Sequence, residues 1–419
     1  MPEFLHLFAE QIKTVPTKDV FESSIDFSIC FDKNWIETDL NSKKAPFEIL
    51  AIDSSSQHQQ LPWEGIFYVV RALGISRSKR YMDLVANVDV SSSTTQEPYF
   101  LSRKREWIEH RVALKALDDG FSGCILIDGS IYGREVHLPL ETTFSNDRDF
   151  MIEYFRTLLD LMDACMERNI CLIGLSKESR SSFFREFLLL NLALETKDVL
   201  GLSEAEIVKM FSEILDHRYD TLRKIKSLKN EKLRILVEEL LSRKPDFALI
   251  LKHAESPGYT VPLLLGASAR WRRGVNQILS DPEGFLKSRF PICSQNEKFV
   301  DEAIEVITRI PEMPAVVSFH ILPSLLDTPI RVDVPAWCLG LKKRLLDIGW
   351  PKKVNVDVER ILDIVSAGYC GPENYNIWLK AAHDCVKLPS DVFENLYLNK
   401  VMDIIGSYKK VRRERYGRF

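Results

Sequence analysis

The chain contains little cysteine, and none of it has the spacing that binds zinc. Only 8 of its 419 residues are cysteine, and no two of them form a Cys-x-x-Cys pair. A zinc ribbon is therefore not expected. A chain of this length can build a large core without a disulfide framework, and scattered thiols suit a reducing compartment, so we expect a cytoplasmic protein.

Long apolar runs and a secretory leader are also missing. No segment approaches the run of about 18 apolar residues that is needed to cross a membrane. The first residues, MPEFLHLFAEQIK, are amphipathic and carry acidic side chains. They lack the basic region followed by an apolar region that marks a signal peptide, so we expect no association with a membrane.

An excess of positive charge is missing as well. Lysine and arginine number 56 against 60 aspartates and glutamates, which gives a formal net charge of −4. Freestanding DNA-binding proteins are usually basic, so tight non-specific binding to DNA by this chain alone is disfavoured. The balance suits an acidic metal site with local basic patches, or DNA that a partner delivers.

The pattern of apolar residues predicts an α/β fold with a mixed sheet flanked by helices. Three strands without intervening helices predict an antiparallel meander, and alternating helices and strands follow. The expected elements are strands at 47–52, 65–73, 84–90, 124–127 and 170–175, with helices at about 102–117 and 149–167.

The pattern becomes wholly helical from residue 181 to about 247. Ser203 and Glu206 form a capping box, and an apolar stripe with helical spacing follows from Ile207. We interpret this stretch as a helical insertion that packs on the sheet domain; an arm that docks a partner is the alternative. Further strands are expected at 260–268, 315–322 and 329–337, and further helices at about 355–367, 375–386 and 390–407.

The order of these elements predicts how the chain is divided. The expected parts are a helical lead-in, the first part of the core, the helical insertion, the second part of the core, and a C-terminal helix with a basic tail: 1–46, 47–180, 181–255, 256–390 and 391–419.

Two aspartates each follow directly on an apolar strand pattern. Asp53 ends the run FEILAID before three serines, and Asp128 ends GCILID before Gly129. Taken singly, Asp53 is most simply a turn residue or a helix N-cap, and Asp128 most simply part of a hairpin turn. Together they predict two carboxylates at neighbouring strand ends, which repel unless a cation such as Mg²⁺ or Mn²⁺ lies between them.

A third carboxylate is expected from the helix that contains REWIEHRVALKAL. Glu109 shares a helical face with Ala113 and Ala116, at i+4 and i+7, so it should face the sheet. A buried glutamate needs a partner, and a cation at the strand ends would be one. A solvated Glu109 at the boundary of the face, or Glu106 as the ligand in its place, are the alternatives.

Three more side chains could complete such a site. Lys177 directly follows a strand and could reach a phosphate, although a solvated loop lysine is more common. Tyr375 and His383 lie eight residues apart on nearly one helical face. His383 could bind a metal or position a water, but a histidine on that face is more often a satisfied core residue.

The C-terminus carries a cluster of basic residues in an otherwise acidic chain. Such a run is usually a solvated tail, and here it could hold the DNA backbone or meet an acidic surface of a partner. The residues are Lys409, Lys410, Arg412, Arg413, Arg415 and Arg418.

Taken in order, these motifs resemble the NurA nuclease family. The order of the motifs and the Tyr–His spacing carry the resemblance more than any single motif does. They run from about residue 47 to residue 385 and read AIDSSS, WIEHRVALKAL, ILIDGS, GLSKES, RVDVP and Tyr-x3-Leu-x2-Ala-His.

The resemblance implies an RNase H-like fold, a toroidal homodimer and DNA cleavage that depends on Mn²⁺ or Mg²⁺. The activity would be that of an exonuclease or a single-strand endonuclease. The implied partner is the HerA hexameric translocase, with which the family resects double-strand breaks.

The resemblance also assigns roles to residues of this chain. It implies that Lys177 contacts a phosphate. It also implies that the metal ligands are Asp53, Glu109, Asp128 and His383, and that Tyr375 joins these four as a catalytic residue. In this hypothesis one ion, held mainly by Asp53 and Asp128, activates the attacking water. A second ion, shared with Glu109 or His383, stabilises the leaving oxygen.

A restriction-type nuclease would need an acid-x-lysine on one strand beside an aspartate, and the sequence has no convincing example. A catalytically inactive scaffold or DNA-binding subunit of a translocase complex is the non-enzyme alternative, and the three retained acids argue against it.

Overall fold

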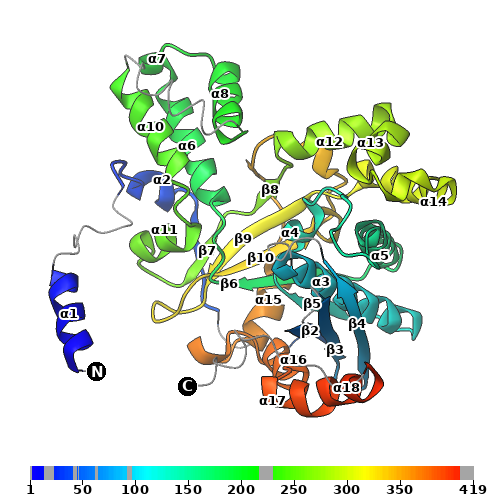
Figure 1. Cartoon of the computed structure of the whole chain (residues 1–419). Helices are drawn as coiled ribbons and strands as arrows, with labels where there is room; N and C mark the ends of the chain where they lie inside the picture. The colour runs from blue at the N-terminus through cyan, green and yellow to red at the C-terminus, as the bar shows by residue number, and fades with distance from the viewer. Residues whose placement is uncertain are drawn as a thin grey trace.

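A mixed sheet with helices on both faces organises the chain, so the α/β class is confirmed (Figure 1). The computed structural model describes residues 2–13, 23–40, 45, 47–61, 65–91, 97–216 and 230–405. The sheet has 11 strands, and its main path has the order β1-β7-β9-β10-β6-β5-β2-β3-β4.

The predicted antiparallel meander forms one side of the sheet. It consists of β2 (Ile49–Gln60), β3 (Gly65–Ile75) and β4 (Arg80–Val90). The expectation that Asp53 ends its strand is wrong, because β2 continues through the serines to Gln60. The polar residues stay in the sheet because main-chain bonds to β3 do not depend on side-chain polarity; Ser54, for example, is paired with Ala72.

Parallel strands form the centre of the sheet. They are β5 (Cys124–Asp128), beside β2, and β6 (Leu172–Lys177), beside β5. The crossover helices are α3 (Glu97–Asp118) and α5 (Phe150–Glu167), near their predicted positions. Asp128 does end its strand, and a short helix, α4 (Ile131–Glu135), follows it instead of a hairpin.

Antiparallel strands complete the other side of the sheet. The predicted strand at 260–268 is two short strands, β7 and β8, because Pro262 interrupts it. The strands are β10 (Ile330–Pro335), β9 (Val316–Leu322), β7 (Gly258–Thr260), β1 (Trp35–Glu37), β8 (Leu263–Leu265) and β11 (Lys352–Lys353).

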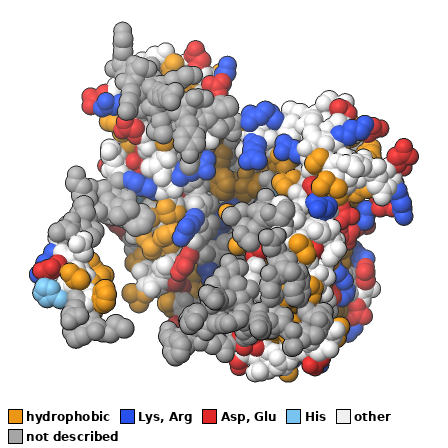
Figure 2. Space-filling view, in the orientation of Figure 1, with side chains coloured by type: hydrophobic (Ala, Val, Ile, Leu, Met, Phe, Trp, Pro, Cys, Tyr) orange, Lys and Arg blue, Asp and Glu red, His pale blue; other side chains and the backbone are white. Residues whose placement is uncertain are grey.

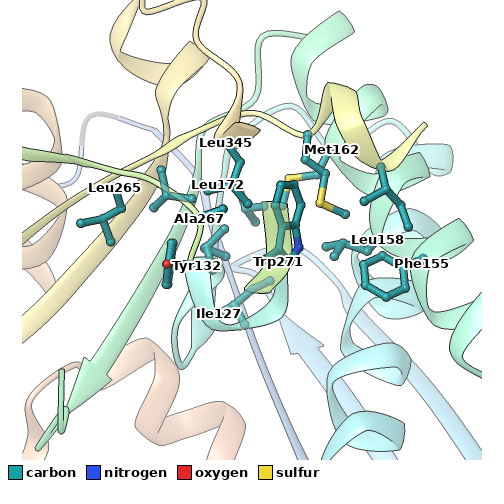
Figure 3. Packing of buried hydrophobic residues seen from close by; sticks show 14 of the residues in the cluster. Ile127, Tyr132, Phe155, Leu158, Met162, Leu172, Leu265, Ala267, Trp271 and Leu345 are labelled. Carbon is teal, nitrogen blue, oxygen red and sulfur yellow. The ribbon is translucent and has the colours of Figure 1, made fainter. Parts of the chain in front are cut away.

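Two apolar cores hold the sheet between its helices. One core lies under α3 and α5 and includes Trp271, which is 1% exposed (Figure 3). The other lies under α15 (Glu359–Gly368) and α16 (Ile377–Val386). Each face of the central strands is therefore buried, which is why β5 and β6 read as continuous apolar runs.

The helical stretch after β6 is present as predicted and lies at the upper left of Figure 1. Its capping box forms, since the Ser203 amide donates to Glu206 at 2.8 Å and the Glu206 amide to Ser203 at 3.4 Å. The helices are α6 (Phe183–Glu195), α7 (Lys197–Leu200), α8 (Glu204–Asp216), α10 (Glu231–Ser242) and α11 (Asp246–His253). The division of the chain with residues 181–255 as an insertion in the core stays a prediction.

Three helices between β8 and β9 were not predicted. They are α12 (Ala269–Ser280), α13 (Pro282–Arg289) and α14 (Glu297–Ile307). Local signals existed, because Ser268 and Asp281 cap α12 and α13 with their side chains, and Pro282 occupies the first turn of α13.

Both ends of the described chain are helical. The N-terminal helix is α1 (Pro2–Lys13), and the last helical stretch consists of α17 (Ser390–Val392), a π-helical turn (Phe393–Leu398) and α18 (Asn399–Ile405). Over the residues described, no helix has both the length and the apolar character needed to cross a membrane.

Candidate functional site

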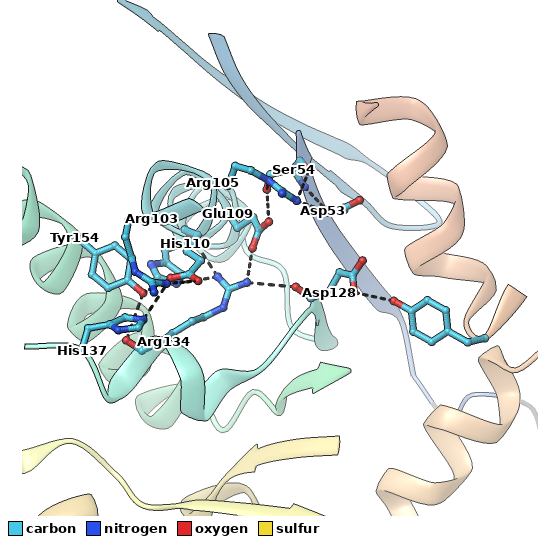
Figure 4. A network of polar contacts seen from close by, with 12 residues as sticks. Asp53, Ser54, Arg103, Arg105, Glu109, His110, Asp128, Arg134, His137 and Tyr154 are labelled. Carbon is cyan, nitrogen blue, oxygen red and sulfur yellow. Dashed lines mark hydrogen bonds and ion pairs between the residues drawn. The ribbon is translucent and has the colours of Figure 1, made fainter. Parts of the chain in front are cut away.

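The sheet places Asp53 beside Asp128 (Figure 4). Ile52 of β2 and Ile127 of β5 are the last pair of the parallel ladder, so the next residue of each strand is one of the two aspartates. Asp53 is 2% exposed although β2 continues beyond it. The two predicted carboxylates therefore do lie side by side, at the point where β2 and β5 separate.

Asp53 is held from the far end of the chain. Nδ1 of His383 lies 2.8 Å from its Oδ2, and the guanidinium of Arg105 lies 4.0 Å from its Oδ1. The side chain of His383 is 45% exposed, so His383 is not the core histidine that was the simpler alternative. The imidazole instead caps a buried carboxylate at the edge of the site.

Asp128 has two partners of its own. The Tyr375 hydroxyl donates to its Oδ1 at 2.9 Å, and Nζ of Lys177 lies 3.8 Å from its Oδ2. Lys177 ends β6 and lies 5.0 Å from the centre of the Tyr375 ring. Burial raises the pKa of Asp128; Lys177 and the Tyr375 hydrogen bond oppose this, and the charge of Asp53 adds to it.

Glu109 reaches the same site from the helix above the sheet. It is 3% exposed and packs on the predicted small face, where Ala113 and Ala116 are fully buried. It accepts a hydrogen bond from the hydroxyl of Ser54, the residue after Asp53, and pairs with Arg134. Burial raises the pKa of Glu109 to about 7, although Arg134 and Ser54 favour the charged form.

Arg134 is the residue that sequence reasoning missed. Its guanidinium pairs with Glu109, lies 3.0 Å from Nε2 of His110 and donates to the main-chain carbonyls of Glu106 and Asp128, each at 3.4 Å. It is 3% exposed. The buried glutamate thus has a cationic partner from the protein itself, where the sequence suggested only a bound cation.

Glu106, the alternative to Glu109, lies in a different setting. Its carboxylate contacts Arg103 at 2.6 Å and accepts from the Tyr154 hydroxyl at 2.7 Å. Neither partner belongs to the aspartate pair. The structure therefore brings Glu109, and not Glu106, to the strand ends.

A buried network supports the loop after Asp128. Asp333 on β10 accepts from the Ser130 hydroxyl at 2.5 Å and from the Tyr132 amide at 3.2 Å, and Arg331 pairs with it at 2.8 Å. Ser130 in turn caps α4. The RVDVP motif therefore acts here as a support that fixes the path from Asp128 to Arg134.

The donors of the site suit a divalent cation, but their present arrangement does not form a cage. Carboxylate oxygens and an imidazole nitrogen are typical Mn²⁺ ligands. Within the described ranges, no three His, Cys, Asp or Glu side chains are grouped so that they could hold a metal ion. Glu109 faces Arg134 and Ser54, so it would have to leave Arg134 to join the aspartates in binding an ion.

One group of predicted residues cannot be placed. Lys409, Lys410, Arg412, Arg413, Arg415 and Arg418 lie outside the described residues. Their role in DNA binding stays a prediction.

Comparison with known proteins gives one family match. A family model described as the NurA domain matches residues 47–388. Similar solved structures include the NurA nuclease from Sulfolobus solfataricus, with 14% identity, a TM-score of 0.49 and coverage of 97% of this chain and 96% of that one. Another is NurA bound to dAMP and manganese, with 14% identity, a TM-score of 0.43 and coverage of 98% and 97%. No curated protein sequence gives a significant match.

Proposed function

Since the chain belongs to the NurA family, whose domain model matches residues 47–388, we propose that it is a nuclease that hydrolyses phosphodiester bonds in DNA. The observation that carries the proposal is the cluster of three buried or half-buried carboxylates where the central strands β2 and β5 separate, with an exposed lysine beside it. Acids and a phosphate-binding cation at one place are what metal-assisted phosphoryl transfer requires.

The proposed cofactor is Mn²⁺ or Mg²⁺. Asp53 and Asp128 would be its main ligands, with Glu109 and His383 completing the set. When bound, such an ion supplies a water of lowered pKa and stabilises charge on the leaving oxygen. The raised pKa of Glu109 and Asp128 supports this assignment, because a cation would relieve the cost of placing buried carboxylates together.

The other side chains of the site would bind and orient the substrate. Lys177 is 55% exposed at the end of β6, so its ammonium can turn to the scissile or a neighbouring phosphate without being pulled from the core. Tyr375 fixes the Asp128 carboxylate by its hydrogen bond, and His383 does the same for Asp53. Both carboxylates are thus held in place before the substrate arrives.

The test of this function is cleavage of end-labelled linear DNA with Mn²⁺, compared with the same reaction in EDTA. Product in Mn²⁺ alone would support the nuclease. Binding without cleavage at any Mn²⁺ concentration would favour the alternative, a catalytically inactive scaffold or DNA-binding subunit.

The two glutamates of α3 offer a matched comparison. Glu109→Gln is expected to lose metal-dependent cleavage, because Glu109 contacts Ser54 beside Asp53. Glu106→Gln should keep most of it, because its partners are Arg103 and Tyr154. Turnover of both variants with labelled DNA checks this, and the opposite ranking would mean that Glu106 is the ligand.

His383 gives a second comparison, between activity and stability. His383→Ala should lower turnover by at least about 10- to 100-fold, since even the loss of a group that only orients a ligand usually costs that much. It should change the melting temperature little, since the side chain is 45% exposed. A drop in melting temperature that accounts for the lost activity would instead indicate a structural role.

The partners are also part of the proposal. We expect a homodimer that works with a HerA-type hexameric translocase in resecting double-strand breaks. DNA contacts of the basic tail should be electrostatic, so deleting residues 409–419 should lower both DNA affinity and its salt dependence. If the truncation leaves both unchanged and abolishes co-purification with the translocase, the tail is a docking element.

A further inference from the structure

One cavity of the molecule is lined by none of the residues of the carboxylate cluster and takes no part in the chemistry proposed above. Its volume is about 690 Å³, within the usual range of roughly 300–1,000 Å³ for small-molecule sites. The start of α3, the segment from 136 to 151 and the helices α12 and α13 line it.

Aromatic rings form much of the wall of this cavity. Phe100 and Phe144 stack with their centres 3.9 Å apart, and Phe150 meets Phe100 edge-on at 5.5 Å. Tyr99 also lines the cavity and is 72% exposed. Phe100, Phe144 and Phe150 are 5%, 0% and 3% exposed, so within this group Tyr99 has the ring face that is open to a flat ligand.

Cationic side chains surround the aromatic wall. Arg103, Arg270 and Arg289 all line the cavity, and Figure 2 shows basic side chains gathered over α12 and α13. Arg103 pairs with Glu106, whereas Arg270 and Arg289 form no ion pair with any described residue, and Arg289 lies 5.9 Å from the centre of the Phe285 ring. The charge of these two arginines is therefore available to an anion. Nε2 of His137, also in the lining, is buried and lacks a hydrogen-bond partner among the described residues.

Two short segments of the chain connect the cavity to the carboxylate cluster. On α3, Arg103 precedes Glu109 by six residues, which is about 9 Å of helix. That length equals roughly three nucleotides of a B-form strand at about 3.4 Å each. Along the other path, the chain passes from Asp128 through α4 and reaches the cavity at Val136.

We propose that this cavity binds one nucleotide of a DNA strand whose scissile phosphate lies at the carboxylate cluster. The base would stack on Tyr99, and the flanking phosphates would meet Arg270 and Arg289. Aromatic rings combined with unpaired cations are the combination that binds single strands without reading their sequence. This inference rests on the proposed function for the identity of the strand.

Two kinds of ligand carry the base and phosphate that the cavity would bind. They are a nucleotide within the strand and a free mononucleotide product. The strand is favoured, because two arginines of the lining that form no ion pair, Arg270 and Arg289, match successive phosphates better than a single one.

The test is binding of a fluorescein-labelled oligo(dT) of 20 nucleotides to the full chain in EDTA, across a salt series. Arg270→Ala should weaken binding about five- to tenfold and lower the salt slope by about 0.7, the amount for one phosphate on a single strand. Tyr99→Ala should weaken binding about tenfold with an unchanged slope, since it removes stacking and no charge.

Arg273→Ala is the matched control, because Arg273 lies on the same helix and does not line the cavity. It should change affinity less than twofold. Equal effects of Arg270→Ala and Arg273→Ala would overturn the proposal, because the helix would then act only as a diffuse positive surface. No effect of Tyr99→Ala would also overturn it.

Two further experiments are needed. One distinguishes a DNA strand from a free mononucleotide, and the other distinguishes failure of the cavity proposal from failure of the nuclease proposal. Displacement of the labelled oligonucleotide by dAMP would identify a mononucleotide site and would overturn the assignment to the strand. Hydrolysis of the p-nitrophenyl ester of thymidine 5′-monophosphate reports on the carboxylate cluster alone, and it should be equal in wild type and the control Arg273→Ala. If wild type hydrolyses neither this ester nor labelled DNA with Mn²⁺, the nuclease proposal fails. The binding results would still show whether the cavity binds a nucleotide.

Discussion

Replacing Asp53 or Asp128 with asparagine is expected to abolish DNA cleavage, with turnover lowered by more than about 100-fold. Removing residues that merely orient metal ligands costs roughly 10- to 100-fold, so removing a ligand should cost more. Both aspartates lie where β2 and β5 separate, and each has a partner that holds it, His383 or Tyr375. Turnover on labelled DNA with Mn²⁺ measures the effect.

The loss of activity should not be accompanied by a loss of stability in these variants. Burial and the neighbouring Asp53 raise the pKa of Asp128, so its charged form is costly in the metal-free protein. Asp128→Asn should therefore melt in EDTA at the same temperature as wild type or higher. A folded variant of either aspartate that still cleaves DNA would overturn the site assignment.

Arg134→Ala is expected to lower the free energy of unfolding by about 3–5 kcal/mol, the usual cost of breaking a buried ion pair. Its partner Glu109 is 3% exposed and would keep its desolvation cost without its counter-charge. The hydrogen bonds to the carbonyls of Glu106 and Asp128 would also be lost. Denaturant unfolding of the metal-free variant measures the change.

Arg105→Ala is the control for that experiment. Arg105 also reaches the site and donates to the Ser54 hydroxyl and carbonyl at 3.2 and 2.9 Å, but it is 44% exposed. Its loss should therefore cost less than about 1 kcal/mol. Adding Glu109→Gln to Arg134→Ala should recover part of the stability, because the unpaired charge is gone. Equal losses for the two arginines would mean that the buried pair does not carry the stability.

The pattern of apolar residues predicted those parts of the site that depend on a single strand or helix. The apolar run GCILID predicted β5 with Asp128 at its end, and the i+4 and i+7 spacing of Ala113 and Ala116 predicted the buried face of Glu109. Both follow from periodicity along a single strand or helix. For the same reason the α/β class and the meander could be predicted.

Parts that depend on contacts across the chain could not be predicted in this way. Arg134 lies on a helix of five residues, which is too short to show a helical period, and its pairing with Glu109 spans 25 positions. The contact of His383 with Asp53 spans 330 positions. The length of β2 was missed because pairing with β3 keeps a polar segment in the sheet.

The claim that this carboxylate cluster is a divalent-metal site is tested most directly by Mn²⁺ binding to the DNA-free protein. Electron paramagnetic resonance follows the loss of the free-ion signal as protein is added. We predict that wild type and Glu106→Gln bind Mn²⁺ alike, and that the double variant Asp53→Asn with Asp128→Asn does not bind. Undiminished binding by the double variant would contradict the account, because the ion would then lie elsewhere.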